Sequence, residues 1–172
     1  PEAPVPIVNI QKEESRLGGA SNVANNIVSL GGHSLLCGVI GHDLFGKEIE
    51  RISRHKNIDT FLLKTSSPTI TKARIIGGKQ QIVRVDYEDK SELNADNKKL
   101  FRDTISRILP EYDILVISDY GKGLISEDLC RYLIKLAHKY DKKVIIDPKG
   151  KNWEKYSGAD IVTPNVKELS DI

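Results

Sequence analysis

The sequence has few cysteines, little net charge and no long apolar run, and each shortage excludes a class of protein. Cys37 and Cys130 are too few for a disulfide framework, and they lack paired metal-ligand spacing. A reducing cytoplasm is therefore the expected compartment. No apolar stretch approaches the roughly 20 residues that cross a bilayer, and the first residues lack a signal-peptide layout. We expect a protein that is neither secreted nor membrane-embedded.

The charges are nearly balanced, with 26 Lys and Arg residues against 24 Asp and Glu residues. The lysines are scattered among acids rather than gathered on one face, so nucleic acid is not expected as a partner. The histidines have no ligand spacing and predict neither a metal site nor a catalytic role. They are His33, His42, His55 and His138. A chain of 172 residues with 39% apolar content is long enough for one core.

Segments with β-type and α-type patterns alternate along the chain, without an internal repeat. Such alternation indicates an α/β fold with a largely parallel sheet. Strands are predicted at 5–10, 34–40, 114–117, 144–146 and 161–162. Helices are predicted at 21–30, 46–56, 96–109 and 127–140, with another beginning at 166. Ser21 or Asn22 is placed to cap the first helix.

Two further β-rich segments, 69–76 and 80–87, flank a Gly-Gly-Lys sequence at 77–79, which is typical of a hairpin. A three-residue turn would pair Ile76 with Gln80 and place four charged side chains on one face. These are Lys72, Arg74, Arg84 and Asp86. A two-residue turn would separate the charges of the first strand from the arginine of the second. The basic groups either bind a substrate phosphate or are solvated charges that protect an edge strand from aggregation.

Polar residues directly follow three successive predicted strands. The segments are 118–123 (SDYGKG), 147–150 (DPKG) and 163–168 (TPNVKE). Ligands of open α/β sheets bind beyond the carboxyl ends of the strands. Each segment places an acid or amide beside a lysine, which suits a phosphorylated ligand with Mg²⁺. One such loop alone is an ordinary strand end, but three together predict a site.

A glycine-rich segment, 18–22 (GGASN), precedes the first predicted helix. Its free backbone N–H groups and its flexibility suit a polar ligand or an anion, and an ordinary helix-start turn is the alternative. The GK[ST] ending of a Walker A loop and the G-x-G-x-x-G dinucleotide fingerprint are both absent.

The order and spacing of these motifs resemble the PfkB family of ribokinase-type carbohydrate kinases. Segment 18–24 (GGASNVA), followed by Gly31 and Gly41, is similar to the first PfkB signature, and 165–168 (NVKE) is similar to the family's NxxE motif. Within the family, four segments look most like the heptose-7-phosphate kinases. These are 68–74, 80–86, 118–123 and 147–150. The resemblance covers essentially the whole chain.

The resemblance implies a ribokinase-like fold, a doubly wound and mostly parallel sheet with helices on both faces and a small β-lid. Lid strands are expected at roughly 5–16 and 60–90, with the α/β core at 17–59 and 91–172. Relative to the family pattern, an opening strand would precede Pro1, and the GAGD-type segment with the catalytic base would follow Ile172. Residues 1–172 are thus expected to be a partial kinase domain that is inactive alone.

The activity implied by the resemblance is phosphorylation of D-glycero-β-D-manno-heptose 7-phosphate at its anomeric hydroxyl, with ATP and Mg²⁺, in ADP-heptose and lipopolysaccharide synthesis. A cytoplasmic homodimer joined through the lid strands is expected. A PfkB kinase for another sugar, such as ribose or fructose 1-phosphate, and a noncatalytic sugar-binding module are the alternatives.

The resemblance also distributes roles among the residues. Substrate contacts are expected from Gly18, Gly19, Asn22, Lys72, Arg74, Arg84, Asp86, Asp119, Lys122, Asp147 and Lys149. Nucleotide contacts are expected from Asn165, Val166, Lys167 and Glu168, with Asn165 and Glu168 ordering Mg²⁺ through water. Asp119 and Asp147 lie at strand ends that the family uses for support, so neither is expected to be the base.

Overall fold

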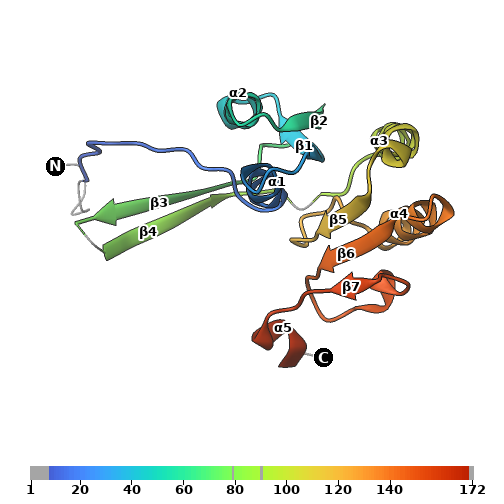
Figure 1. Ribbon diagram of the computed structural model, residues 1–172. Coiled ribbons are helices and arrows are strands. Elements are labelled where there is room, and N and C mark those ends of the chain that lie inside the picture. The colour runs from blue at the N-terminus through green and yellow to red at the C-terminus, as the bar shows by residue number, and fades with distance from the viewer. Residues whose placement is uncertain (1–7, 79, 90, 171–172) are drawn as a thin grey trace.

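The computed structural model describes residues 8–78, 80–89 and 91–170, and its helices alternate with strands except where three strands follow one another between residues 59 and 87 (Figure 1). The helices are α1 (Ala20–Ser29), α2 (Leu44–His55), α3 (Ala95–Ile108), α4 (Glu127–Lys139) and α5 (Val166–Ser170), with short 3-10 turns η1 (Leu109–Glu111) and η2 (Glu154–Tyr156). The strands are β1 (Leu35–Gly41), β2 (Asp59–Thr65), β3 (Thr71–Gly77), β4 (Gln80–Tyr87), β5 (Ile114–Ser118), β6 (Lys143–Asp147) and β7 (Ile161–Val162). The predicted helices are confirmed to within two residues at each described end.

The strands form three groups rather than one continuous sheet. The pair β1–β2 is parallel, the order β5-β6-β7 makes a second parallel sheet, and β3–β4 is an antiparallel hairpin. Strand β2 was not predicted, and its pairing with β1 removes residues 60–65 from the expected lid. The predicted strand at 5–10 is wrong over residues 8–10, which have no regular secondary structure because no described strand pairs with them. Residues 5–7 lie outside the described part.

Helices cover both faces of the β1–β2 pair, because successive side chains of a strand point to opposite faces. Leu36 of β1 packs in one apolar cluster with Ala24 of α1. The next residue, Cys37, packs against a second cluster, which is built on α3 and α4. Phe61 of β2 lies on that same side, with its ring centroid 5.6 Å from the ring of Phe101 in α3. The α/β arrangement with helices on two faces is therefore confirmed for this pair.

The larger apolar core lies between α3, α4 and one face of the β5-β6-β7 sheet. Helix α4 contributes buried residues at helical spacing, which are Leu129, Cys130, Leu133, Ile134, Leu136 and Ala137. Ile117 of β5 and Ile146 of β6 meet them from the sheet. Burial raises the pKa of Cys130 to about 11 and that of Cys37 to about 12, so both thiols stay protonated at neutral pH. Both cysteines are thus packing residues, as predicted.

The hairpin β3–β4 extends away from the rest of the molecule (Figure 1). Its turn differs from the prediction, because Gly77 pairs with Gln80 and only two residues lie between them. The register then shifts, since Ile76 pairs with Gln81 while Ile75 pairs with Val83. Ile82 is thereby left without a partner, as in a β-bulge.

The bulge decides which side chains share a face of the hairpin. One extra residue in a strand reverses its alternation of faces, so it cancels the effect of the shorter turn. Lys72 therefore lies opposite Asp86, and Arg74 lies opposite Arg84. The predicted shared face of these four charged residues is confirmed, although the predicted Ile76–Gln80 pairing is wrong.

The base of the hairpin is fixed by hydrogen bonds around Thr69, which is 2% exposed. The Asp43 carboxylate accepts bonds from the Thr69 backbone N and hydroxyl, both at 2.7 Å. Asp43 also begins α2, by accepting a 2.7 Å bond from the Gly46 N. The Gly41 N at the end of β1 donates to the Thr69 hydroxyl at 2.8 Å. One buried group of bonds thus joins β1, α2 and the hairpin.

None of the described helices combines the length and the apolar character that crossing a membrane requires.

Candidate functional site

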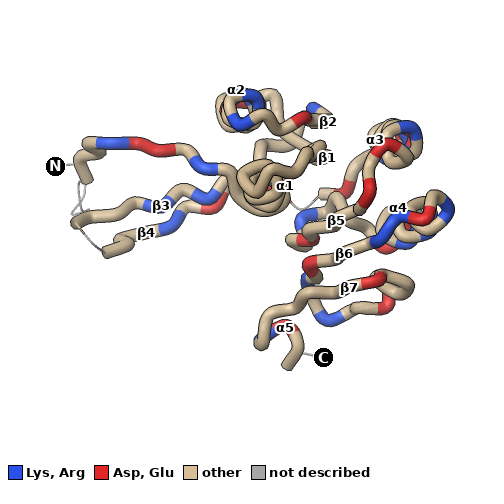
Figure 2. Tube along the Cα trace, viewed as in Figure 1, with Lys and Arg blue, Asp and Glu red and all other residues tan. Residues whose placement is uncertain are grey.

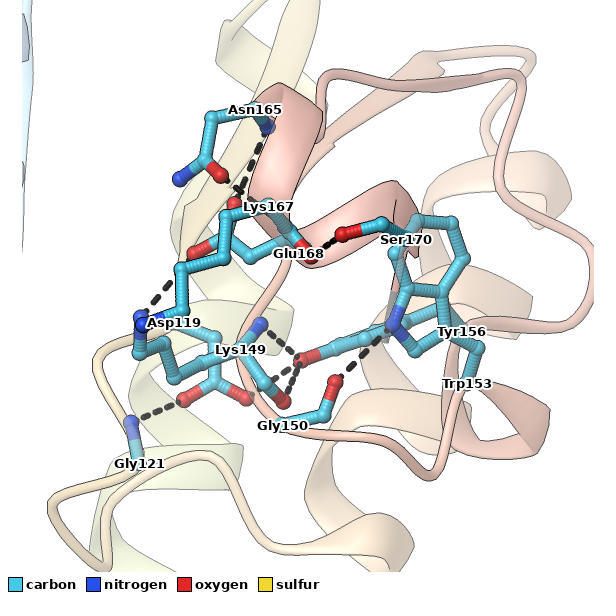
Figure 3. Close-up of polar contacts among 10 residues, drawn as sticks. All are labelled: Asp119, Gly121, Lys149, Gly150, Trp153, Tyr156, Asn165, Lys167, Glu168 and Ser170. Atoms are coloured by element: carbon cyan, nitrogen blue, oxygen red, sulfur yellow. Dashed lines mark hydrogen bonds and ion pairs between the residues drawn. The ribbon is translucent and has the colours of Figure 1, made fainter. Parts of the chain in front are cut away.

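The loops that follow β5, β6 and β7 lie together, as the parallel order predicts (Figure 3). The last residues of β5 and β6, Ser118 and Asp147, are register partners. The Asp119 N donates to the Asp147 carbonyl at 2.9 Å. In the loop after β6, the Lys149 ammonium lies 3.0 Å from a carboxylate oxygen of Glu168, a residue of α5 beyond β7. Three strand ends therefore form one site, called here the strand-end site.

The glycine turn before α1 joins this site through Tyr120. Gly19 has φ 56° and ψ −138°, a backbone conformation that side chains with a Cβ avoid. A Cβ atom placed on Gly19 would lie 3.4 Å from the Tyr120 ring. In the loop after β5, a Cβ atom placed on Gly121 would lie 3.5 Å from the Lys149 Cγ. The glycine turn, the loop after β5 and the loop after β6 are consequently neighbours.

The start of α1 differs from the prediction, because neither Ser21 nor Asn22 caps the helix. The helix is preceded by Gly19, which provides no side-chain cap. The Ser21 hydroxyl instead donates to the Gly18 carbonyl at 2.6 Å. The exposed Asn22 side chain makes no hydrogen bond to another described residue, so it is available to a ligand.

Asp119 is buried, with 3% of the residue exposed, and its carboxylate is bonded on both oxygens. One oxygen accepts the Gly121 N at 2.7 Å. The other contacts the Lys155 ammonium at 2.5 Å and the Tyr156 hydroxyl at 2.8 Å. Asp119 was expected to contact substrate, but in this structure all of these bonds are internal to the protein. It supports the loop around it.

Lys122 also has an internal partner. Its ammonium forms an ion pair with the Glu88 carboxylate, just beyond the end of β4. This contact links the loop after β5 to the base of the hairpin. The expected substrate contact by Lys122 would therefore require the ammonium to be shared with Glu88.

Asn165 and Glu168 form reciprocal hydrogen bonds at the start of α5. The Asn165 side-chain oxygen accepts the Glu168 N at 2.9 Å, and the Glu168 carboxylate accepts the Asn165 N at 3.0 Å. This is the pattern of a capping box. The bond from Asn165 and the contact with Lys149 hold the pKa of Glu168 below its usual value. Val166 and Lys167, also expected near the nucleotide, are exposed and make no side-chain bond within the strand-end site.

Asp147 is the carboxylate of this site that has no hydrogen-bond partner among the described side chains. Partial burial, followed by the nearby charge of Glu168, raises its pKa. No group of three or more His, Cys, Asp or Glu side chains in the described ranges is arranged to hold a metal ion. Mg²⁺ commonly uses only one or two protein carboxylates, together with phosphate oxygens and water. Asp147 and Glu168 fit that kind of site.

The charged residues of the hairpin lie in the half nearest α1 (Figure 2). Lys72 and Arg84 both contact the Asp86 carboxylate, at 3.2 and 2.9 Å. Although partial burial opposes it, these two cations lower the pKa of Asp86. Arg74 has no ion-pair partner within the described ranges. No described hydrogen bond or ion pair joins these four residues to the strand-end site, so the structure brings the predicted residues together in two groups.

Sequence reasoning missed several residues that organise these groups. Lys155 and Tyr156 lie more than 35 positions from Asp119 and follow no motif, so no sequence signal identified them. Tyr120 lies inside a predicted site segment but had no predicted role. Asp43 carried a usable signal, because an aspartate just before a helical pattern is a common N-cap.

Comparison with known proteins gives relatives over nearly the whole chain. Residues 2–172 match the family described as pfkB family carbohydrate kinase. The chain is 47% identical over 171 residues to the bifunctional protein HldE of Helicobacter pylori strain P12, covering 98% of this chain and 37% of that protein. It is 41% identical over 170 residues to the protein of the same name from Sulfurimonas denitrificans, covering 98% and 36%. The chain thus spans little more than a third of the length of these relatives.

Solved structures show the same fold at low identity. The tetrameric inhibited form of phosphofructokinase-2 from Escherichia coli aligns with a TM-score of 0.73 and 20% identity, over 98% of this chain and 56% of that one. A possible 1-phosphofructokinase from Thermotoga maritima aligns with a TM-score of 0.76 and 21% identity, over 95% and 53%. The ribokinase-like α/β fold is confirmed by these neighbours. Because the family match extends over almost every residue, the chain belongs to the pfkB family of carbohydrate kinases.

Proposed function

We propose that this chain is part of a kinase that phosphorylates D-glycero-β-D-manno-heptose 7-phosphate at its anomeric hydroxyl. The product would be the 1,7-bisphosphate, used in the cytoplasm for ADP-heptose and lipopolysaccharide core synthesis. The observation that carries this proposal is the 41–47% identity to bifunctional HldE proteins over 98% of the chain. The phosphofructokinase structures support only the fold, because their identity to this chain is 20–21%.

The strand-end site supplies groups suited to Mg-ATP. Mg²⁺ bound with ATP would neutralise phosphate charge during phosphoryl transfer. Asp147 offers unpaired carboxylate oxygens to it, and Glu168, whose two oxygens contact the Lys149 ammonium and the Asn165 N, would meet it through water. The Lys149 ammonium lies beside Glu168 and can neutralise the negative charge of a phosphoryl group. Asp119 is bonded on both oxygens, so we do not assign it as the base that deprotonates the sugar.

We assign the sugar to the glycine turn and its phosphate to the hairpin. Gly18, Gly19 and Asn22 offer backbone and amide groups for sugar hydroxyls. Arg74 is the best candidate for the phosphate, because Lys72 and Arg84 already share Asp86. A guanidinium can bind phosphate through two parallel hydrogen bonds.

Replacing Arg74 with alanine in the full natural chain should raise the KM of the phosphorylated sugar about tenfold. The reason is the loss of a charge-assisted contact worth roughly 1.5 kcal/mol. The kcat should change little, because the contact lies away from the transferred group. Arg54→Ala serves as the control, since Arg54 is an exposed cation of α2. Steady-state kinetics with an unchanged KM for Arg74→Ala would remove Arg74 from the substrate site.

The opposite face of the hairpin is apolar and suits a second copy of the chain. Val83, Val85 and Tyr87 of β4 are 43%, 38% and 47% exposed there. We propose a homodimer in which these faces pack together, because exposed apolar surface of this kind commonly marks an interface. Val85→Glu should shift the sedimenting mass of the full natural chain from dimer toward monomer. A wild-type chain that sediments as a monomer would contradict the dimer.

The choice of substrate is tested by kinetics with the full natural chain. Turnover of the heptose 7-phosphate, with a kcat/KM well above that for ribose or fructose 1-phosphate, is expected. Turnover of ribose without turnover of the heptose phosphate would favour another kinase of the family. Calorimetry separates the noncatalytic alternative, because a sugar-binding module would bind the sugar but not Mg-ATP.

A further inference from the structure

Tyr156 joins the loops after β5 and β6 through a single buried hydroxyl (Figure 3). It accepts a 2.9 Å hydrogen bond from the Lys149 backbone N. It lies 2.8 Å from the Asp119 carboxylate and 3.2 Å from the Lys149 carbonyl. A hydroxyl has one proton to donate, and the shorter bond to a carboxylate is the stronger one. The hydroxyl therefore donates to Asp119 while it holds the Lys149 main chain.

The Asp119 end of this connection is rigid. Asp119 is also bonded to the Gly121 N and to the Lys155 ammonium, which fix both of its oxygens. The Tyr156 ring is buried in the larger apolar core, with 3% of the residue exposed. Burial, and then the neighbouring Asp119 carboxylate, raise the pKa of Tyr156, so its hydroxyl stays protonated at neutral pH. The bond can therefore persist throughout a reaction cycle.

The Lys149 side chain, in contrast, is free to change its contact. It is 52% exposed, and its ammonium has only the Glu168 carboxylate as a described partner. The main chain of Lys149 is thus fixed while its ammonium can exchange Glu168 for a phosphate group. Fixing the main chain limits the positions that the ammonium can reach.

We propose that Tyr156 is a positioning residue, which sets the reach of the Lys149 ammonium by holding the Lys149 main chain to Asp119. The inference rests on the proposed role of Lys149 in phosphoryl transfer. It adds a residue outside every motif of the sequence, on the 3-10 turn η2 between β6 and β7.

A double-mutant cycle in the full natural chain tests this role. Tyr156→Phe keeps the ring and removes the hydroxyl. We expect kcat to fall about tenfold, with less than a roughly threefold change in the KM of the sugar. The reason is that the Lys149 ammonium, once less well positioned, stabilises less of the negative charge that builds up in the transition state. In a Lys149→Met background the same change should lower kcat less than about twofold. Equal losses in both backgrounds, or no loss in the natural background, would overturn the proposal.

Two further measurements separate positioning from a general loss of stability. Tyr140→Phe is the matched control, because the Tyr140 hydroxyl makes no hydrogen bond to a described residue. The kcat of this variant should equal that of the natural chain. Hydrogen exchange of the natural chain gives a readout without any variant. The Lys149 amide should exchange slowly, and exchange at the rate of a free peptide would overturn the proposal. The cycle can use whichever sugar the natural chain phosphorylates, so an error in the proposed substrate would be recognised separately.

Discussion

Replacing Lys155 with methionine is expected to lower the free energy of unfolding by about 3–5 kcal/mol, because it leaves a buried carboxylate without its cation. The side chains of Lys155 and Asp119 are only 16% and 2% exposed. The ammonium also lies 4.9 Å from the centroid of the Tyr156 ring. Methionine retains much of the length of lysine, so the loss should come mainly from the missing charge. Thermal unfolding of the full natural chain would show it as a lower melting temperature of the kinase domain.

Two controls show that this loss comes from a buried pair. Lys143→Met removes a cation of similar length, but the Lys143 side chain is 73% exposed beside Asp160, so the melting temperature should change little. Asp119→Asn combined with Lys155→Met removes both charges and should cost less than the sum of the single changes. A Lys155→Met variant as stable as Lys143→Met would contradict the described ion pair.

Replacing Gly41 with alanine is expected to cost about 3 kcal/mol of stability, because β1 ends where other backbone groups leave no space for a methyl group. The added Cβ would lie 2.6 Å from both the Ser67 carbonyl and the Asp43 carboxylate, and 2.9 Å from the Thr69 N. Backbone atoms cannot move aside as a flexible side chain does. The variant should therefore disrupt the bonds that fix the base of the hairpin.

Gly38 offers a matched control within the same strand. A Cβ atom on Gly38 would lie 3.7 Å from a methyl carbon of Leu62, which is an ordinary contact. Gly38→Ala should thus change the free energy of unfolding by less than about 1 kcal/mol. Denaturant unfolding of both variants gives the comparison. Equal stabilities would mean that the surroundings of Gly41 are looser than described.

The helices and parallel strands were predictable because their signals are local. Helix α4 has apolar residues at helical spacing and is capped by Ser126, whose hydroxyl accepts a hydrogen bond from the Leu129 N. Strand β2 was missed, since residues 60–65 (TFLLKT) were assigned to the lid, and only their pairing with β1 places them in the core. Strand partners that are distant in sequence leave no local signal.

The hairpin shows how a correct conclusion can follow from a wrong register. The sequence predicted that Lys72, Arg74, Arg84 and Asp86 share a face, but through a three-residue turn. The structure has a two-residue turn and an unpaired Ile82, and the two differences compensate. A bulge depends on how the whole strand packs, so the turn residues alone did not predict it.

The sequence predicted where the strand-end segments meet, but not which side chains bond to one another there. Parallel order brings the segments after β5, β6 and β7 together, which the sequence pattern indicated. The partners of individual side chains did not follow from that pattern. Asp119 bonds to Tyr156, 37 positions away, and Glu168 bonds to Asn165 as a helix cap. The motif residues thus support one another within the strand-end site.

Phosphorus NMR of the reaction catalysed by the full natural chain tests the proposed function most directly. With Mg²⁺, ATP and D-glycero-β-D-manno-heptose 7-phosphate, a new resonance from a phosphate on the anomeric oxygen should appear as ATP is converted to ADP. Lys149→Met should slow its appearance about a hundredfold, as expected for the loss of a group that stabilises transferred charge. No new heptose phosphate resonance, under conditions in which the same protein phosphorylates ribose, would contradict the account.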